Sequence, residues 1–490
     1  MPKDIRALLH EQTLRYQSLP ENAEIAWRAP IELLTPNRLD IPARYLFAKN
    51  YLAKRCVDLG QDVYTGLIRA WHERTKGFDP GKRSLDDYVH QFRALIDNLG
   101  NSGFDEEQSV IPLVDGSIVD GAHRVAAALA LGIEKMPCVT LQGVPQVQNA
   151  QTLRSIGISP QIVDYCIQQH VELDPRLRAA VFFPCAQTKL EEGLALFSSR
   201  NEVVYTASVH VTRRGMENFV TELYGNLDWW DEYQEKSFAA RRYKKGVPVT
   251  VVFFRQNLDD MQEFKDQVRD VLQQANDSIH TTDAHWEAVN LARLVYNANS
   301  LDCLNYAKKG HTPVFDARFA RYKELVQQNP AHEHLFALDY GSVLAAYGLR
   351  DVSDIDYVFD QGAPDIEDME MMINPHNWLY VEAPLRLDLL IHDPRNHFYK
   401  NGVKFLCADI VQFVKSRRTR SKDNRDVFLL KNRHSPLFLS APDIRGTLRR
   451  LKSGGARAAH SLVLLCKKHL PETMYQKLRG VYRTFWKREE

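Results

Sequence analysis

Two aspartates separated by one residue, Asp354 and Asp356, are the side chains of this sequence best suited to chemistry. Residues two apart in a strand project to the same side, so both carboxylates would face one point while Ile355 faces away. Neighbouring carboxylates are costly to keep ionised unless a cation lies between them. Because Mg²⁺ takes oxygen ligands and leaves positions for phosphate oxygens, the pair predicts a magnesium site that serves a phosphate-bearing substrate.

A Gly-Ser pair, Gly341 and Ser342, lies eleven residues before the first of these aspartates. The apolar run 335–338 predicts a strand that ends just before this pair, and 343–347 predicts a short helix after it. Backbone N–H groups at such a turn, together with the serine hydroxyl, can bind a phosphate. The alternative is that both aspartates are turn and strand-edge residues on a solvated face.

A third carboxylate, Asp388, lies in the apolar run 385–391, which we expect to form a strand. An unpaired carboxylate between leucines would be expensive to bury, which favours a role as a metal ligand. Asp393 and Glu382 are the alternatives for this position. Further along, Lys415 opens a basic stretch that leads to a Lys-Asp pair and a second aspartate at 422–426.

Together these residues resemble the nucleotidyltransferase superfamily, whose signature is Gly-Ser, about ten residues and Asp-x-Asp, with a third carboxylate on a neighbouring strand. The stretches 414–418 and 422–426 look like the helical element of its minimal members, in which Lys415 would approach the nucleotide phosphates. The resemblance spans 335–426. It implies in-line attack of a hydroxyl or phosphate on the α-phosphate of ATP or another nucleoside triphosphate, with Asp354, Asp356 and Asp388 as catalytic metal ligands for Mg²⁺.

A strand, a tight turn and a helix are predicted around Asp120, Gly121, His123 and Arg124. Free N–H groups in the first helical turn favour an anion, and an arginine adds a bidentate phosphate donor. The motif resembles the ParB/sulfiredoxin-like fold. That resemblance implies a second nucleotide site, with Asp120 catalytic, as in members that are free-serine kinases, and the other three residues binding the nucleotide. The alternative is a helix N-cap with a solvent-facing His-Arg pair.

His280 is the candidate catalytic residue of the middle of the chain, where β-rich runs alternate with helical stretches. The order of elements and the turn that follows it resemble nucleoside diphosphate kinases, in which that histidine carries the phosphate. Thr282 matches the family, whereas Thr281 and Leu291 stand where it has a glycine and a glutamate. The other interpretation is a degenerate ferredoxin-like scaffold with His280 as a turn residue.

The 490 residues are too many for one hydrophobic core, and 44% hydrophobic with 26% charged residues is an ordinary globular composition. We predict an α/β and α+β multidomain fold. A ParB/sulfiredoxin-like domain would cover 1–175, a ferredoxin-like domain 176–300, a nucleotidyltransferase-fold mixed sheet 301–435, and a basic amphipathic helical tail 436–490.

Charge is unevenly distributed: 415–490 holds 20 Lys and Arg against 6 Asp and Glu, although the whole chain is at +1. The tail has one apolar stripe with basic flanks, which is typical of a helix on an anionic membrane surface. Docking on the protein's own acidic body and nucleic-acid binding are the alternatives, but no specific nucleic-acid module is recognised. Seven scattered cysteines without a Cys-x-x-Cys pair favour reduced thiols in the cytosol, and we expect no signal peptide.

The sequence thus predicts a cytoplasmic enzyme, peripheral to the inner face of the membrane if the tail binds there. We expect metal-dependent nucleotidyl transfer to a sugar, sugar phosphate or polyol, since proteins with this mixture of domains resemble those of bacterial surface-polysaccharide assembly. Two alternatives stay open. One is a small-molecule kinase that uses the N-terminal motif, and the other is a non-enzymatic nucleotide-binding scaffold or sensor.

Overall fold

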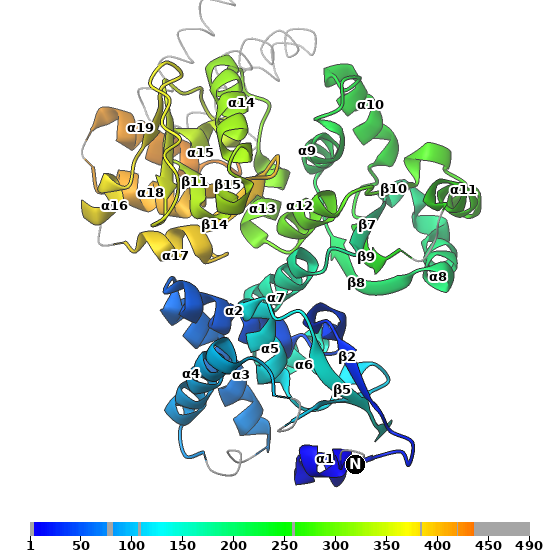
Figure 1. Cartoon of the computed structure of the whole chain (residues 1–490). Coiled ribbons are helices and arrows are strands. Elements are labelled where there is room, and N and C mark those ends of the chain that lie inside the picture. Colours follow the sequence, from blue (N-terminus) through cyan, green and yellow to red (C-terminus); the bar gives the residue numbers. More distant parts are fainter. Residues whose placement is uncertain are drawn as a thin grey trace, which may run out of the picture.

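The computed structural model describes residues 4–75, 82–105, 109–256, 260–382, 385–418 and 420–435. Over these residues the chain is a mixed α/β protein with several small sheets and many helices. Three sheets have four or five strands, and the strands of each come from one stretch of the chain (Figure 1). None of the described helices is long and apolar enough to cross a bilayer. The predicted basic tail, 436–490, lies outside the described residues.

The N-terminal sheet has the strand order β2-β5-β3-β4. Its strands are β2 (Ile25–Arg28), β3 (Ile111–Val114), β4 (Ser117–Ile118) and β5 (Met136–Thr140), with β3 and β5 parallel. Helix α5 (Ala122–Leu131) connects β4 to β5, and its buried alanines allow α2 (Asp40–Ala53) and α4 (Leu85–Ser102) to pack closely against it. The predicted strands and helix around the Asp120 turn are therefore confirmed.

Smaller elements frame this first sheet. They are η1 (Ile5–Leu8), α1 (Glu11–Leu14), η2 (Pro30–Leu33), α3 (Val57–Thr75), α6 (Ala150–Ser155) and a two-stranded sheet of β1 (Gln17–Ser18) and β6 (Gln142–Gly143). Helix α7 (Pro160–Leu173) then leads to the middle sheet, and it lies at the centre of the molecule in Figure 1.

The middle sheet is antiparallel with the order β10-β7-β9-β8. Its strands are β7 (Leu177–Phe182), β8 (Glu202–Val209), β9 (Val249–Arg255) and β10 (Ile279–Thr281). Alternate residues of β7 enter two different cores, because successive side chains point to opposite faces. One face is covered by α8 (Leu190–Arg200) and α11 (Met261–Leu272). The other is covered by α7, α9 (Arg213–Tyr224) and α12 (His285–Val295).

Between α9 and β9 lies helix α10 (Glu232–Arg242), with the short turns η3 (Pro184–Lys189) and η4 (Ala275–Asp277) elsewhere in this part. Helices α13 (Ala298–Tyr306) and α14 (Pro313–Gln327) and the turn η5 (Pro330–Leu335) connect the middle sheet to the last sheet.

The C-terminal sheet is mixed, with the order β13-β12-β11-β15-β14. The central strand β11 (Phe336–Asp339) pairs antiparallel with β12 (Ile355–Phe359) and parallel with β15 (Val403–Leu406). The edge strands are β13 (Ile373–Pro375) and β14 (His397–Lys400). Its helices are α15 (Gly341–Ala346), α16 (Trp378–Glu382), α17 (Leu387–His392), α18 (Ala408–Ser416) and α19 (Ser421–Lys431). The strand predicted for 385–391 is wrong, because these residues lie mostly in α17.

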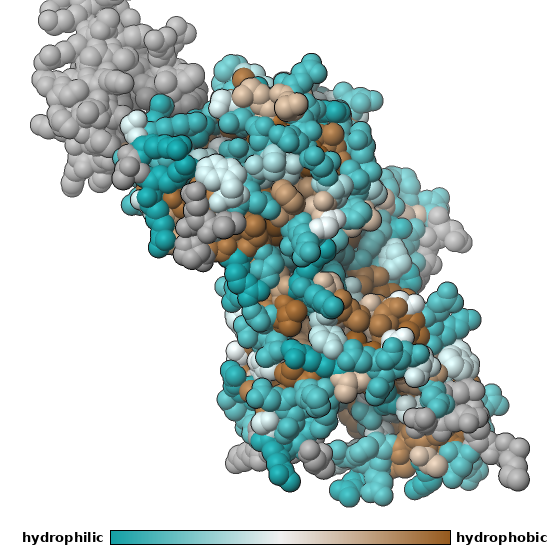
Figure 2. Space-filling view, turned by 60° about the vertical axis from the view of Figure 1, so that its left-hand side comes forward, coloured by the Kyte–Doolittle hydropathy of each residue, from teal (hydrophilic) through white to brown (hydrophobic). Residues whose placement is uncertain are grey.

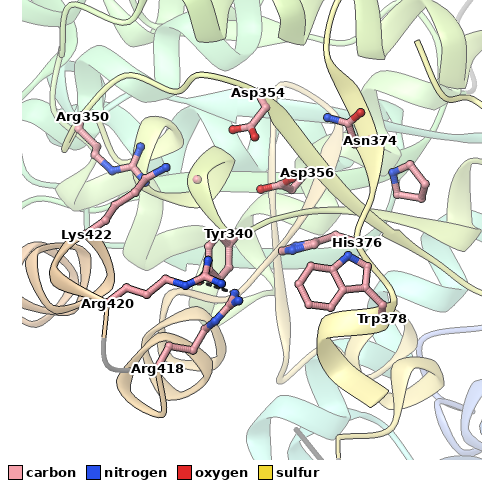
Figure 3. A pocket seen from close by; sticks show the side chains of 12 residues that line it. Tyr340, Arg350, Asp354, Asp356, Asn374, His376, Trp378, Arg418, Arg420 and Lys422 are labelled. Carbon is pink, nitrogen blue, oxygen red and sulfur yellow. Dashed lines mark hydrogen bonds between the residues drawn. The ribbon is translucent and has the colours of Figure 1, made fainter. Parts of the chain in front are cut away.

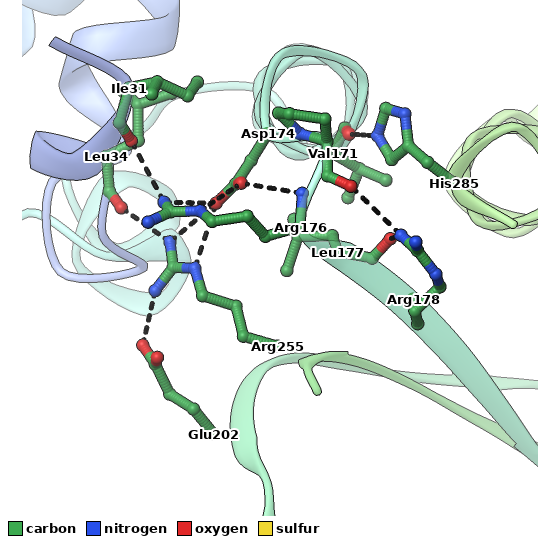
Figure 4. A network of polar contacts seen from close by, with 11 residues as sticks. Ile31, Leu34, Val171, Asp174, Arg176, Leu177, Arg178, Glu202, Arg255 and His285 are labelled. Carbon is green, nitrogen blue, oxygen red and sulfur yellow. Dashed lines mark hydrogen bonds and ion pairs between the residues drawn. The ribbon is translucent and has the colours of Figure 1, made fainter. Parts of the chain in front are cut away.

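The N-terminal and middle parts share one continuous hydrophobic core, in which side chains of α2 and α7 meet those of β7. A polar network also joins them (Figure 4). Asp174 pairs with Arg176 and Arg255, and these arginines donate to the carbonyls of Ile31 and Leu34. In Figure 2, hydrophobic side chains show in patches at the level where the N-terminal part adjoins the other two.

Candidate functional site

A cavity of about 320 Å³ opens at the end of β11, where the turn into α15, strands β12 and β13, and the loop between α18 and α19 meet (Figure 3). Acidic and basic side chains share this cavity, because the aspartates come from the start of β12 and the cations come mainly from the α18–α19 loop and the start of α19. The lining residues are Tyr340, Gly341, Arg350, Asp354, Asp356, Asn374, Pro375, His376, Trp378, Arg418, Arg420 and Lys422.

Asp354 and Asp356 both line the cavity, as the two-residue spacing predicts. Asp354 directly precedes β12 and accepts a hydrogen bond of 2.9 Å from the Ser353 hydroxyl. Within the described part of the chain the Asp356 carboxylate accepts no hydrogen bond and forms no ion pair. The two carboxylates are therefore available to a ligand.

Burial, against the opposing charge of His376 and with the nearby charges of Asp354 and Asp339, raises the pKa of Asp356 to about 6. A carboxyl group whose ionisation the fold makes costly is a group that a bound cation would stabilise. The electrostatics thus agree with a cation-binding role for this pair.

Asp339 lies next to the cavity lining, since it is paired with Asp356 in the register of β11 and β12. It is fully buried, and it accepts a hydrogen bond of 2.5 Å from the Tyr380 hydroxyl and lies 3.2 Å from Nδ1 of His376. Burial lowers the pKa of His376, but the hydrogen bond and charge of Asp339 outweigh it and the net shift is upward. Asp339 therefore favours the protonated form of the His376 imidazole at the cavity wall.

Asp388 does not lie in this cavity. Because 385–391 forms α17 and not a strand, the Asp388 carboxylate turns to Arg386, with contacts of 2.6 and 3.1 Å, and its carbonyl accepts a hydrogen bond from the Cys56 thiol. The alternative Asp393 pairs with Arg395 at 2.6 Å, and the Glu382 side chain is outside the described residues. The amide of Asn374 is the group that lies opposite Asp356 on β13.

No group of three or more His, Cys, Asp or Glu side chains placed to hold a metal occurs in the described residues. The predicted three-carboxylate cluster is therefore not assembled there. Mg²⁺ is nevertheless commonly held by one or two carboxylates while substrate phosphates and water fill the other positions. Asp354 and Asp356, with the Asn374 amide beside them, fit that type of site.

The Gly-Ser turn lies where the sequence predicts it. Gly341 lines the cavity, and the buried Ser342 hydroxyl has no hydrogen-bond partner among the described residues. Tyr340, just before them, has φ 51° and ψ −106°, which costs free energy in a residue with a side chain. Its hydroxyl donates to Asp423 at 2.7 Å and accepts from Arg418 at 3.2 Å. These contacts with α19 and the preceding loop hold the strained turn in place.

Lys415, predicted to bind nucleotide phosphates, points away from the cavity lining. It is fully buried, with its ammonium 2.9 Å from Asp426, 3.3 Å from Asp423 and 3.1 Å from the ring centre of Tyr340. Arg350 forms two further contacts of 2.7 Å with Asp426. Lys415 thus positions the α18–α19 pair against the Gly-Ser turn.

Arg418, Arg420 and Lys422, and not Lys415, are the basic residues of this segment that line the cavity. Arg420 and Lys422 are exposed, and neither forms an ion pair within the described residues. His376, Trp378 and Arg420 were not recognised from the sequence, because they come from separate segments that only the fold brings together.

We expect Lys415→Met to lower stability by about 2 kcal/mol, since it leaves buried carboxylates with one partner fewer. Lys422→Met should leave stability almost unchanged and weaken nucleotide binding. Urea unfolding and nucleotide titration of both variants make the comparison. If Lys415→Met unfolded at the normal urea concentration but lost affinity for the nucleotide, Lys415 would instead bind the nucleotide directly.

The N-terminal motif around Asp120 and Arg124 does not line this cavity, and its side chains contact other residues of the N-terminal part. Gly121 has φ +90°, where a Cβ would come 2.7 Å from Ile111. Arg124 pairs with Asp120 at 3.5 Å and donates to the Val110 carbonyl. His123 is not solvent-facing, since its Nε2 lies 2.9 Å from the Tyr64 hydroxyl and 3.3 Å from Arg44. Burial and the surrounding arginines lower the His123 pKa, so the imidazole is neutral.

His280 lies on the edge strand β10 and lines a different cavity between the middle sheet and the C-terminal sheet. Its ring packs edge-on against Tyr224, with ring centres 5.1 Å apart, and burial lowers its pKa to about 3. The three predicted centres are thus separate from one another in the described part of the chain.

The chain matches no protein-family model, and no curated protein and no solved structure matches it.

Proposed function

We propose that the cavity at the end of β11 binds a nucleoside triphosphate with Mg²⁺ and transfers its nucleotidyl group to a small hydroxyl- or phosphate-bearing acceptor. A sugar, sugar phosphate or polyol is the acceptor that the sequence resemblance favours. One observation carries the proposal: Asp354 and Asp356 share a cavity of about 320 Å³ with Arg418 and Arg420 of the α18–α19 loop and Lys422 at the start of α19.

The two kinds of charge suit the two parts of such a substrate. Asp354 and Asp356 would hold the Mg²⁺, which when bound neutralises the phosphate charge and polarises the reacting phosphorus. Arg418, Arg420 and Lys422 would bind the remaining phosphate oxygens, since guanidinium groups give paired hydrogen bonds to phosphate. The strained turn at Tyr340 would keep the Gly341 backbone directed into the cavity.

The strand order of the middle sheet also supports the proposal, and the domain identities belong to it. The order β10-β7-β9-β8 with crossing helices is that of a ferredoxin-like domain. We propose a ParB/sulfiredoxin-like fold for the first part and a nucleotidyltransferase fold for the last. The boundaries at 175, 300 and 435 remain predictions.

Incubation with ATP labelled at the α- or the γ-phosphate tests the function. Label transferred to a small acceptor from the α-position, with release of pyrophosphate, supports the proposal. Transfer from the γ-position alone would identify a kinase instead. Binding without turnover of any of the four nucleoside triphosphates, over a panel of sugars, sugar phosphates and polyols, would favour a nucleotide sensor.

A further inference from the structure

A second and larger cavity, of about 740 Å³, lies between the middle and C-terminal sheets. Its walls come from α9, β10, α12, α14 and the turn between β14 and β15. The volume falls within the range of small-molecule sites, which occur preferentially between domains. Phe336 at the start of β11 lines this cavity and Tyr340 just after β11 lines the first one, so the two cavities lie at opposite ends of one strand.

Most charges of this cavity are neutralised by the protein itself. Arg293 bridges Glu172 and Glu333 at 2.9 and 3.1 Å. Glu287 accepts hydrogen bonds of 2.7 and 2.9 Å from the backbone N–H groups that precede α12. Burial raises the pKa of Glu222 to about 7 and lowers that of Lys404 to about 7, so their charges are weakened at neutral pH. The lining therefore carries no strong net charge of either sign that would attract a strongly anionic or a strongly cationic ligand.

Several polar side chains of the lining nevertheless lack partners. Within the described residues, the side chains of His280, Asn290 and Lys323 form no hydrogen bond and no ion pair. Glu222 accepts only one hydrogen bond, of 2.8 Å, from the Asn401 backbone. Donors and acceptors are therefore mixed along the walls, which suits a ligand whose groups can both donate and accept.

The lining also offers an apolar face. Trp286 lines the cavity from α12 with 58% of its surface exposed, and Leu227, which follows α9, also lines it and is 44% exposed. A large exposed indole beside unpartnered polar groups is a surface on which the C–H face of a ring can pack.

We propose that this cavity binds a neutral polyhydroxylated molecule, a sugar or a short oligosaccharide, with its ring on Trp286 and its hydroxyls on Asn290, Lys323 and Glu222. Hydroxyl groups donate and accept at the same atom, carry no charge and leave an apolar ring face, which matches all three properties of the lining. The inference does not depend on nucleotidyl transfer in the first cavity.

Saturation-transfer NMR on the full chain tests the inference. The probes are glucose, galactose, N-acetylglucosamine, cellobiose, lactose and chitobiose at up to about 10 mM, with serine and glutamate as zwitterionic and anionic comparisons. We expect saturable binding of at least one sugar. Trp286→Ala should weaken it about tenfold or more, and Asn290→Ala should weaken it as well.

Trp229→Ala is the matched control, because Trp229 is 50% exposed on the same part of the chain and does not line the cavity. It should leave sugar binding unchanged, and so should Asp356→Asn in the first cavity. No binding of any sugar, binding that is insensitive to Trp286→Ala, binding lost in Asp356→Asn, or preference for serine or glutamate would each overturn the inference.

Discussion

Asp356→Asn is expected to reduce nucleotidyl transfer by about two orders of magnitude or more. The substitution keeps the shape of the side chain but removes the charge that would hold Mg²⁺ beside the phosphates. Loss of ~3 kcal/mol of transition-state stabilisation corresponds to a factor of about 100 in rate. Steady-state rates with saturating Mg²⁺ and nucleotide, measured with the α-labelled substrate, give the comparison.

The same variant should fold at least as stably as the original chain. The Asp356 carboxylate has a raised pKa and no hydrogen-bond partner in the described residues, so its charge costs free energy in the native state. A thermal midpoint equal to or above that of the original chain, together with lost turnover, would separate a functional effect from misfolding.

Asp365→Asn is the matched control, because Asp365 is an exposed aspartate of the same sheet region outside the cavity. It should change neither rate nor stability. Undiminished turnover of Asp356→Asn would remove the carboxylate pair from the mechanism. Equal losses in both variants would point to a general effect of charge on this part of the molecule.

The sequence alone was sufficient to predict that the carboxylates of Asp354 and Asp356 lie together, because the prediction depends only on the geometry of a single strand. Strand residues two apart share a face wherever the strand lies, so Asp354 and Asp356 reach one cavity. The apolar runs of the middle part likewise predicted β7, β8 and β9; β7 and β9 are buried on both faces, whereas β8 exposes Thr206 and Ser208.

The prediction for Asp388 failed because short apolar runs fit two periods. The run 385–391 reads as a buried strand, but the periodicity of so short an apolar run does not distinguish a strand from a buried helical segment, and the chain forms α17. Arg386 then supplies the charge partner that the argument from burial assigned to a metal. The prediction for Lys415 was wrong for a similar reason, since Lys415 lies on the buried side of helix α18 and does not line the cavity.

Residues far apart in sequence could not be assigned to a site in advance. His376 acts with Asp339, which reads as the polar end of an apolar strand, and Arg420 reaches the cavity from beyond α18. The contacts between the parts are equally nonlocal, since Asp174 meets Arg255 across 81 residues and the arginine meets Leu34 across 221. No local period encodes such partners.

That nonlocal network carries the second large effect: Asp174→Ala should lower stability by about 3–5 kcal/mol. Asp174 is fully buried, and its two oxygens accept from Arg176 at 2.7 and 2.8 Å and from Arg255 at 2.9 Å. Removing the carboxylate leaves the guanidinium of Arg255, which is largely buried, with only the half-exposed Glu202 as an ion-pair partner among the described residues. Urea unfolding followed by tryptophan fluorescence, with the urea midpoint compared between variants, measures the loss.

The pH dependence identifies the cause. Burial raises the pKa of Asp174, but its hydrogen bonds and ion pairs with the two arginines outweigh this and the net shift is downward. A carboxyl group with a lowered native pKa contributes its stability above the ordinary value and loses it as pH falls through the lowered value. The difference between the original chain and Asp174→Ala should therefore stay constant above about pH 5 and shrink only in acid.

Asp266→Ala provides the comparison, because Asp266 pairs with Arg269 at 2.6 Å on the surface of α11 with its side chain 60% exposed. An exposed pair contributes about 1 kcal/mol or less, so this variant should be nearly neutral. If Asp174→Ala lost no more than Asp266→Ala, the network would add little beyond the hydrophobic core that already joins the two parts, and the arginines would be solvated in both states. A large loss that persists unchanged in acid would instead assign the effect to packing around Asp174 and not to its charge.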